Sequence, residues 1–188
     1  FQATLEIKPE KAIKLEKDAL AQIENITADN ARLVSNLHAN LGGLYRMNGH
    51  PDLAREHMEK SISLLDQFNL LHINDSIPQI ANYAMFLTEQ QEPERGISEL
   101  QKLSGIIKEY HSDDCLDYAK VQETLGTIYL MTANLPQAKT HFKRAFKIYE
   151  KIWADEPEMI EAIYQEIQEL YPQIGFCIGK NLSGLLTK

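Results

Sequence analysis

One pattern of small and large residues occurs three times in this 188-residue chain, and it constrains the fold more than any other feature. Small residues stand at Gly42, Ala84 and Gly126, so each copy follows the last by 42 residues. Equal steps with matching residue sizes indicate a repeated structural unit whose copies share a core. The residues in register are Leu41-Gly42, Tyr45, Gly49, Ala54, Met58 and Ser61, then Tyr83-Ala84, Leu87, Gln91, Gly96, Leu100 and Leu103, then Leu125-Gly126, Tyr129, Ala133, Ala138, Phe142 and Ala145.

The glycines of the first copy admit two interpretations, a phosphate-binding loop or close packing between helices. A phosphate loop needs G-x-x-x-x-G-K-[ST], or G-x-G-x-x-G after a strand, because backbone amides hold the phosphates. Gly43 and Gly49 are followed by His50-Pro51 and fit neither motif. We therefore interpret the glycines as architectural. In this interpretation a small residue lets two helices approach, and a large residue, such as Met58 or Phe142, fills the remaining gap.

The repeat resembles the tetratricopeptide repeat, whose pattern places Leu-Gly, Tyr, Ala and Phe along two antiparallel helices. The third copy, LGTIYLMTANLPQAKTHFKRAF, matches best, whereas the second has Leu87 for the tyrosine and Gly96 for the alanine. The step of 42 is similar to the longer repeats of kinesin light chains and of many bacterial regulators. The resemblance implies an all-α fold, in which antiparallel helix pairs stack into a right-handed superhelix.

Proline positions and repeat counting give the expected organisation, with about nine helices. Pro51, Pro93 and Pro136 fall in the first turn of each second helix, where a missing amide donor costs nothing. Asp113 and Asp114 are expected to cap a helix that begins at Cys115. We expect the second helix of a truncated repeat over 1–26, full repeats over 27–70, 71–112 and 113–154, and over 155–188 a partial fourth repeat with the capping helix FCIGKNLSGLL.

Charge and composition narrow the function class. Nineteen Lys and Arg against 27 Asp and Glu give a net charge of -8, which disfavours nucleic acid as a partner. No apolar run reaches the roughly 18 residues of a membrane span, and we expect a soluble, cytoplasmic chain that does not bind membranes. Cys115 and Cys177 suggest neither a disulfide framework nor a zinc knuckle. The chain begins at Phe1, so we expect a fragment or a processed product.

No pattern in the sequence points to catalysis. The six histidines occur singly, without the H-E-x-x-H spacing of a zinc helix, and no G-x-S-x-G elbow is present. The densest group of metal-capable side chains, HSDDC at 111–115, is better explained as a capped loop between repeats. We expect no enzyme activity, no metal and no cofactor.

The family resemblance implies a binding site, because first helices line a concave groove in such stacks. Asn40 and Asn82 share one repeat position, and their amides could bond the backbone of an extended peptide. The alternative is that each asparagine bridges neighbouring helices. A clamp for a carboxylate is disfavoured, because Ala39 and Gly43 stand where such a clamp needs polar side chains. The predicted groove residues are Asn36, Asn40, Arg46, Asn82, Met85, Lys120, Glu123 and Thr127.

Two functions agree with this site. The first is a scaffold that holds an extended or helical peptide of a protein partner. The second is the sensor half of a larger regulator with an attached DNA-binding or catalytic domain. A basic stripe at Lys139, Lys143 and Lys147 could meet the acidic segment 155–169 of another copy in a homo-oligomer, or could simply be a solvated face.

Overall fold

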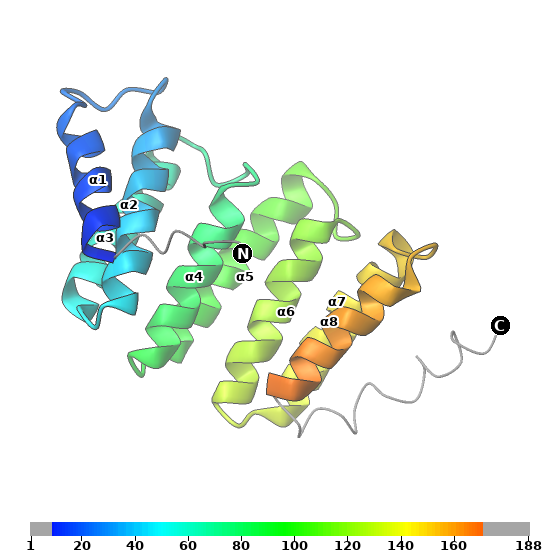
Figure 1. Cartoon of the computed structure of the whole chain (residues 1–188). Helices are drawn as coiled ribbons and strands as arrows, with labels where there is room; N and C mark the ends of the chain where they lie inside the picture. Colours follow the sequence, from blue (N-terminus) through cyan, green and yellow to red (C-terminus); the bar gives the residue numbers. More distant parts are fainter. Residues whose placement is uncertain (1–8, 171–188) are drawn as a thin grey trace, which may run out of the picture. The chain divides into compact units, whose positions relative to one another are not determined.

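The computed structural model describes residues 9–170, and these form eight α-helices packed in antiparallel pairs (Figure 1). No strand occurs in this range, which confirms the all-α prediction. The expected capping helix at 176–186 lies outside the described residues. The helices are α1 (Pro9–Ala21), α2 (Ala31–Met47), α3 (Pro51–Gln67), α4 (Ser76–Glu89), α5 (Pro93–Tyr110), α6 (Leu116–Met131), α7 (Leu135–Ile152) and α8 (Pro157–Leu170).

Helix boundaries recur at the interval that the sequence predicted. The first helices α2, α4 and α6 end at Met47, Glu89 and Met131, at steps of 42 residues. The second helices begin at the same step, and α1 falls into this series as the second helix of a preceding repeat. Proline occupies the first turn of α3, α5 and α7, as expected. The starting residues of α1, α3, α5 and α7 are Pro9, Pro51, Pro93 and Leu135.

One turn geometry joins the two helices of all three repeats. At Gly49, Gln91 and Ala133 the backbone is left-handed, with φ of 72°, 65° and 57°. The next residue donates its N–H to a carbonyl five residues earlier, which is the Schellman end of a helix. These bonds run from His50 to Tyr45 at 2.9 Å, from Glu92 to Leu87 at 2.8 Å, and from Asn134 to Tyr129 at 2.7 Å.

The glycines at the head of the repeats are sites of close helix approach. A Cβ built on Gly42 would lie 2.5 Å from Cγ of Met58, and one on Gly126 would lie 2.9 Å from two ring carbons of Phe142. No side chain larger than hydrogen fits without movement of the partner. The architectural interpretation of these residues is therefore confirmed.

The chain divides into two compact units, residues 1–86 (unit 1) and 87–188 (unit 2). In unit 1, α2 packs mainly against α3 and also against α1. In unit 2, α6 packs mainly against α7, α5 packs on α6, and α8 packs on α7. Each unit buries its own apolar core, with fully buried Leu41 and Leu65 in unit 1 and Leu125 and Phe142 in unit 2. The right-handed superhelix and the repeat boundaries stay predictions.

The expected cap of α6 was wrong. Cys115 is the N-cap itself, and its Sγ accepts the N–H of Tyr118 at 3.4 Å. The carboxylate of Asp114 instead pairs with Lys151 of α7, which holds the pKa of Asp114 below its usual range through a hydrogen bond and charge attraction. An aspartate that has a lysine within reach on the neighbouring helix is drawn away from the helix end.

Candidate functional site

Asn36 of α2 takes part in a polar network inside unit 1. Its side-chain amide donates to Asp75 at 3.2 Å, and its oxygen accepts from the amide of Gln79 on α4. Asp75 also binds Arg32 at 2.6 Å, and this bond lowers the pKa of the Asp75 carboxyl and raises that of the guanidinium. Asn36 thus ties α2 to the start of α4.

The same network extends into the core of unit 1. Ser35 is buried and donates to the side-chain oxygen of Gln79 at 2.8 Å, and Ser61 of α3 binds the same oxygen. The three polar side chains satisfy one another between α2, α3 and α4. Sequence reasoning missed this cluster, because Ile77 follows Ser35 by one repeat and no periodic signal marks the position.

The two asparagines that share a repeat position have different surroundings. Asn40 is exposed and donates to Oε1 of Glu16 on α1 at 3.0 Å, so here the amide bridges two helices. The other carboxylate oxygen of Glu16 is buried without a hydrogen-bond partner. Asn82 on α4 is also exposed, but its side chain has no hydrogen bond to any described residue. Asn82 therefore offers a complete set of amide donors and acceptor to solvent.

The remaining predicted residues lie on first helices of both units. Arg46 and Met85 in unit 1 are half-buried. In unit 2, the half-buried Glu123 accepts from the hydroxyl of Tyr149 on α7, and Thr127 donates to the Glu123 carbonyl at 3.1 Å. Burial, followed by the charge of Glu123, raises the pKa of Tyr149. The side chain of Lys120 is exposed and forms no ion pair within the described part of the chain.

A histidine cluster joins α2 and α3 in unit 1. Nδ1 of His38 lies 2.9 Å from Nδ1 of His57, and the ring of Tyr45 stacks on His57 at 5.4 Å between centroids. Burial lowers the pKa of His38 to about 4, with further contributions from His57 and Lys60, while Glu56 acts in the opposite direction. Both rings are therefore held in their neutral form near pH 7.

An equivalent cluster joins α6 and α7 in unit 2. Nδ1 of His141 lies 2.9 Å from the side-chain oxygen of Gln122, and Tyr129 stacks on His141 at 5.3 Å. Each residue follows its counterpart in unit 1 by 84 positions, which is two repeats. Comparing positions two repeats apart would have found this signal, but the second repeat, with Ile80 and Glu99, hides it.

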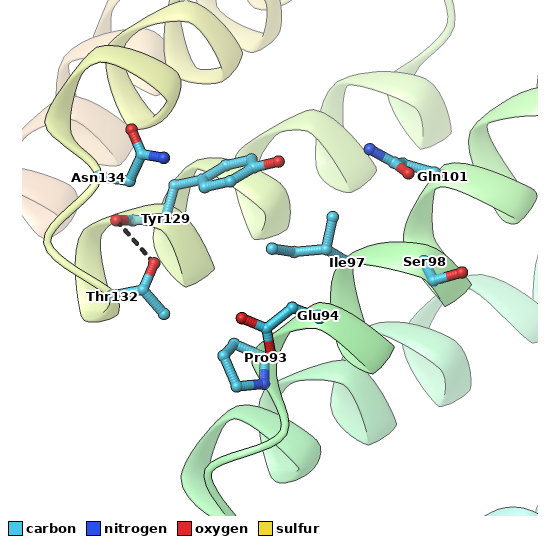
Figure 2. A pocket seen from close by; sticks show the side chains of 8 residues that line it. All are labelled: Pro93, Glu94, Ile97, Ser98, Gln101, Tyr129, Thr132 and Asn134. Atoms are coloured by element: carbon cyan, nitrogen blue, oxygen red, sulfur yellow. Dashed lines mark hydrogen bonds between the residues drawn. The ribbon is translucent and has the colours of Figure 1, made fainter.

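A pocket of about 460 Å³ opens in unit 2 between α5 and the end of α6 (Figure 2). One wall follows a single face of α5, and the other combines the last turn of α6 with the N-cap of α7. We refer to it as the α5–α6 pocket. It is lined by Pro93, Glu94, Ile97, Ser98, Gln101, Tyr129, Thr132 and Asn134.

Comparison with known proteins decides the family. Residues 76–151, which include the second and third copies of the pattern, match the family model of the tetratricopeptide repeat. This part of the chain belongs to the tetratricopeptide repeat family. The recognition made from the repeated pattern is thereby confirmed, and proteins built from this repeat are generally protein-interaction modules.

Two solved structures with a similar fold are kinesin-light-chain-like proteins. It is similar to BtubC (BKLC) from P. vanneervenii, with a TM-score of 0.69, 17% identity, and coverage of 95% of this chain and 73% of the other. It is also similar to a Podospora anserina protein described as a kinesin light chain with nearly identical TPR-like repeats, with a TM-score of 0.67, 14% identity, and coverage of 78% and 69%. At these identities the likeness concerns the fold. No significant match was found among curated proteins.

The described residues of this repeat protein hold no constellation for metal chemistry. Across 9–170, no group of three or more His, Cys, Asp or Glu side chains is arranged to hold a metal ion. This includes the segment HSDDC, where Asp114 and Cys115 serve the ion pair and the cap described above. Within the same range, each helix is too short or too polar to cross a bilayer.

Proposed function

We propose that this chain is a protein-interaction scaffold that binds an extended or helical peptide along the first helices of its repeats. The observation that carries the proposal is the exposed amide of Asn82 on α4, which no described residue engages. A short polar side chain on a rigid helix loses little conformational freedom when it binds a peptide. Because its amide bonds to the peptide backbone, such binding tolerates many peptide sequences.

Lys120 on α6 supports the same proposal from unit 2. Its side chain is exposed and unpaired within the described residues, whereas Glu123, one turn later, is already engaged by Tyr149. A lysine free of internal partners can meet an acidic side chain of a bound peptide. The first helices of both units therefore carry polar groups that the fold itself does not use.

The predicted groove residues differ in how far their side chains are already engaged by hydrogen bonds within the fold. Asn36 is committed to Asp75 and Gln79, and Asn40 is bound to Glu16, so a peptide would compete with internal bonds at both. At Asn82 no internal bond is lost on binding. We infer that Asn82 contributes more to peptide affinity than Asn40 does.

A selection experiment tests the proposal. Peptides that bind the intact chain are selected from a displayed random library, and the affinity of the best peptide is measured by calorimetry. Replacement of Asn82 by alanine removes hydrogen bonds worth about 1 kcal/mol each, so affinity should fall about fivefold or more. Asn40→Ala should have a smaller effect.

The matched control is Gln67→Ala, which removes an exposed amide from the last residue of the second helix α3. Its affinity should equal that of the unaltered chain. If Asn82→Ala and the Asn40/Asn82 double variant bind as tightly as the control, the first helices do not form the peptide site and the proposal is wrong.

A further inference from the structure

We propose that the α5–α6 pocket binds the arginine side chain of a protein partner. This inference rests on the proposed interaction function but concerns a different surface, on a second helix and the end of the next first helix. The volume of about 460 Å³ lies within the range of about 300 to 1,000 Å³ that small-ligand sites occupy. Three features select the ligand: the charge, the aromatic ring and the unused polar groups of the lining.

The charge of the lining favours a cation. Glu94 is the acidic residue of the pocket, and the lining contains no Lys, Arg or His. Arg95, its neighbour on α5, is directed to Glu92 at 2.6 Å. Glu94 itself has no ion pair or hydrogen bond with any described residue. Its carboxylate is therefore available to a cationic group, and the net charge of -8 attracts cationic partners at longer range.

The helix ends around the pocket do not reverse this preference. The N-termini of α5 and α7 each contribute about half a positive charge, and the C-terminus of α6 contributes about half a negative charge. Together these three helix ends leave about half a positive charge, which is smaller than the full negative charge of Glu94. An anion bound here would lie beside an unpaired carboxylate, which an arginine would neutralise.

Tyr129 supplies a fixed aromatic surface. His141 stacks on one face of its ring at 5.3 Å, and Gln122 in turn bonds His141, so buried neighbours hold the ring in place. The ring also lines the pocket, and Figure 2 shows it extending from α6 towards α5. A guanidinium group stacks on tyrosine and binds a carboxylate through two parallel N–H bonds, which an ammonium group cannot do.

The remaining polar groups complete an arginine site. The side chains of Ser98 and Gln101 on α5, like the hydroxyl of Tyr129, have no hydrogen bond within the described part of the chain. Their oxygens can accept from the N–H groups of a guanidinium that Glu94 does not use. Ile97 lies between these groups on the same face of α5 and can contact the methylene stem of the arginine.

Titration of the intact chain with N-acetyl-arginine methylamide, followed by NMR, tests the proposal. The isosteric citrulline compound lacks the charge, and the lysine compound lacks the planar fork. We expect the arginine compound to shift the signals of Ile97 and Tyr129 and to bind at least about tenfold more tightly than either analogue. Glu94→Gln should remove this advantage, while Glu109→Gln, at the other end of α5, should keep it.

Tyr129→Leu supplies a second variant, because Leu87 holds the same repeat position in the second copy. It should weaken the arginine compound several-fold and leave the citrulline compound unchanged, with thermal unfolding confirming that the variant is folded. Equal binding of arginine and citrulline compounds, equal binding of the lysine compound, or tighter binding of inorganic sulfate would overturn the proposal. Tighter binding of free L-arginine than of the blocked compound would also overturn it, because the ligand would then be an amino acid.

The titration separates this proposal from the peptide site on the first helices. The Asn40/Asn82 double alanine variant should bind the arginine compound like the unaltered chain. A chain that binds its selected peptide through Asn82 but ignores the arginine compound would refute the pocket alone. A chain that binds the arginine compound while Asn82→Ala has no effect on peptide affinity would refute the first-helix site alone.

Discussion

The helix pairs α2–α3 and α6–α7 share one plan but fill it with different side chains. Both place a glycine on the first helix beneath a large residue of the second, Gly42 beneath Met58 and Gly126 beneath Phe142. A Cβ on Gly42 would meet Cγ of Met58 and also the backbone of α3 at Ala54 and Met58, whereas the three atoms nearest to a Cβ on Gly126 all belong to the Phe142 ring. The glycine allows the close approach of the helices in both pairs, and the atoms that face it determine the cost of an added methyl group.

The pairs differ again in the polar contact between their two helices. The histidine of the second helix, His57 or His141, faces a histidine in one pair and a glutamine in the other, at 2.9 Å in both. A glutamine does not titrate, whereas His38 does. Both pairs thus keep the same distance and the stacked tyrosine. Only α2 has a titratable side chain in this contact, because α6 has a glutamine where α2 has His38.

The largest loss of stability should appear when either of these glycines becomes alanine. Gly126→Ala forces a methyl group against the Phe142 ring, at a cost of about 1 to 3 kcal/mol that the better helix propensity of alanine only partly offsets. Gly42→Ala should cost at least as much, because its Cβ would lie 2.5 Å from Cγ of Met58 and 3.3 Å from two backbone atoms, the Ala54 carbonyl oxygen and the Met58 nitrogen. The free energy of unfolding in urea, measured for both variants at one pH, gives the comparison.

Gly43→Ala is the matched control for this experiment. It lies beside Gly42 in α2, and a Cβ there would meet nothing within 4 Å. Helix propensity alone should then stabilise the protein by about 0.5 to 1 kcal/mol. If Gly126→Ala proved as stabilising as Gly43→Ala, the contact with Phe142 would not limit the helix approach, and the comparison of the two pairs would fail.

A change of pH should sharpen the second difference. With a folded pKa of about 4 against about 6.5 in the unfolded chain, His38 is neutral in both states above pH 6.5. As pH falls from 6.5 to 4, His38 binds a proton in the unfolded chain but stays neutral in the folded chain, so the free energy of unfolding decreases. His38→Gln copies the glutamine–histidine contact of the other pair. It should remove on the order of 1 kcal/mol of this acid loss, since solvent screens the half-buried ring.

Denaturant unfolding of the unaltered chain and His38→Gln at pH 7 and pH 4.5 measures the effect. The two proteins differ only at residue 38, so the difference between their pH dependences reports the effect of that side chain and of its contact with His57. His57 keeps its own lowered pKa, which burial mainly causes and Lys17 reinforces against the effect of Glu56. Parallel pH dependence of the two proteins would show that the histidine pair contributes nothing to acid sensitivity.

The sequence predicted those features that recur at one repeat and missed those that do not. Helix starts, helix ends and the small-to-large register all return every 42 residues, so three copies reinforce one signal. Glu16 occupies the repeat position of Met58, but it binds Asn40 and does not fill the gap beside a glycine. Sequence comparison did not reveal this exception, because the first repeat is truncated. The α5–α6 pocket joins the second helix of one repeat to the first helix of the next. Its walls meet through packing between repeats, which periodicity within a repeat does not describe.

The smallest expected effect concerns the turn within each pair. Gly49 and Ala133 adopt the same left-handed conformation, with φ of 72° and 57°, but only glycine adopts it without a steric cost. Ala133→Gly should therefore stabilise the protein by about 0.5 kcal/mol, because relief of strain exceeds the entropy that glycine adds to the unfolded chain. Gly49→Ala, where a Cβ meets nothing within 4 Å, should destabilise by a similar amount for conformational reasons alone.

The combined variant exchanges the two turns and should unfold at nearly the original temperature. A loss of stability with Ala133→Gly would mean that the methyl group contributes packing at the α6–α7 turn that glycine lacks at the α2–α3 turn.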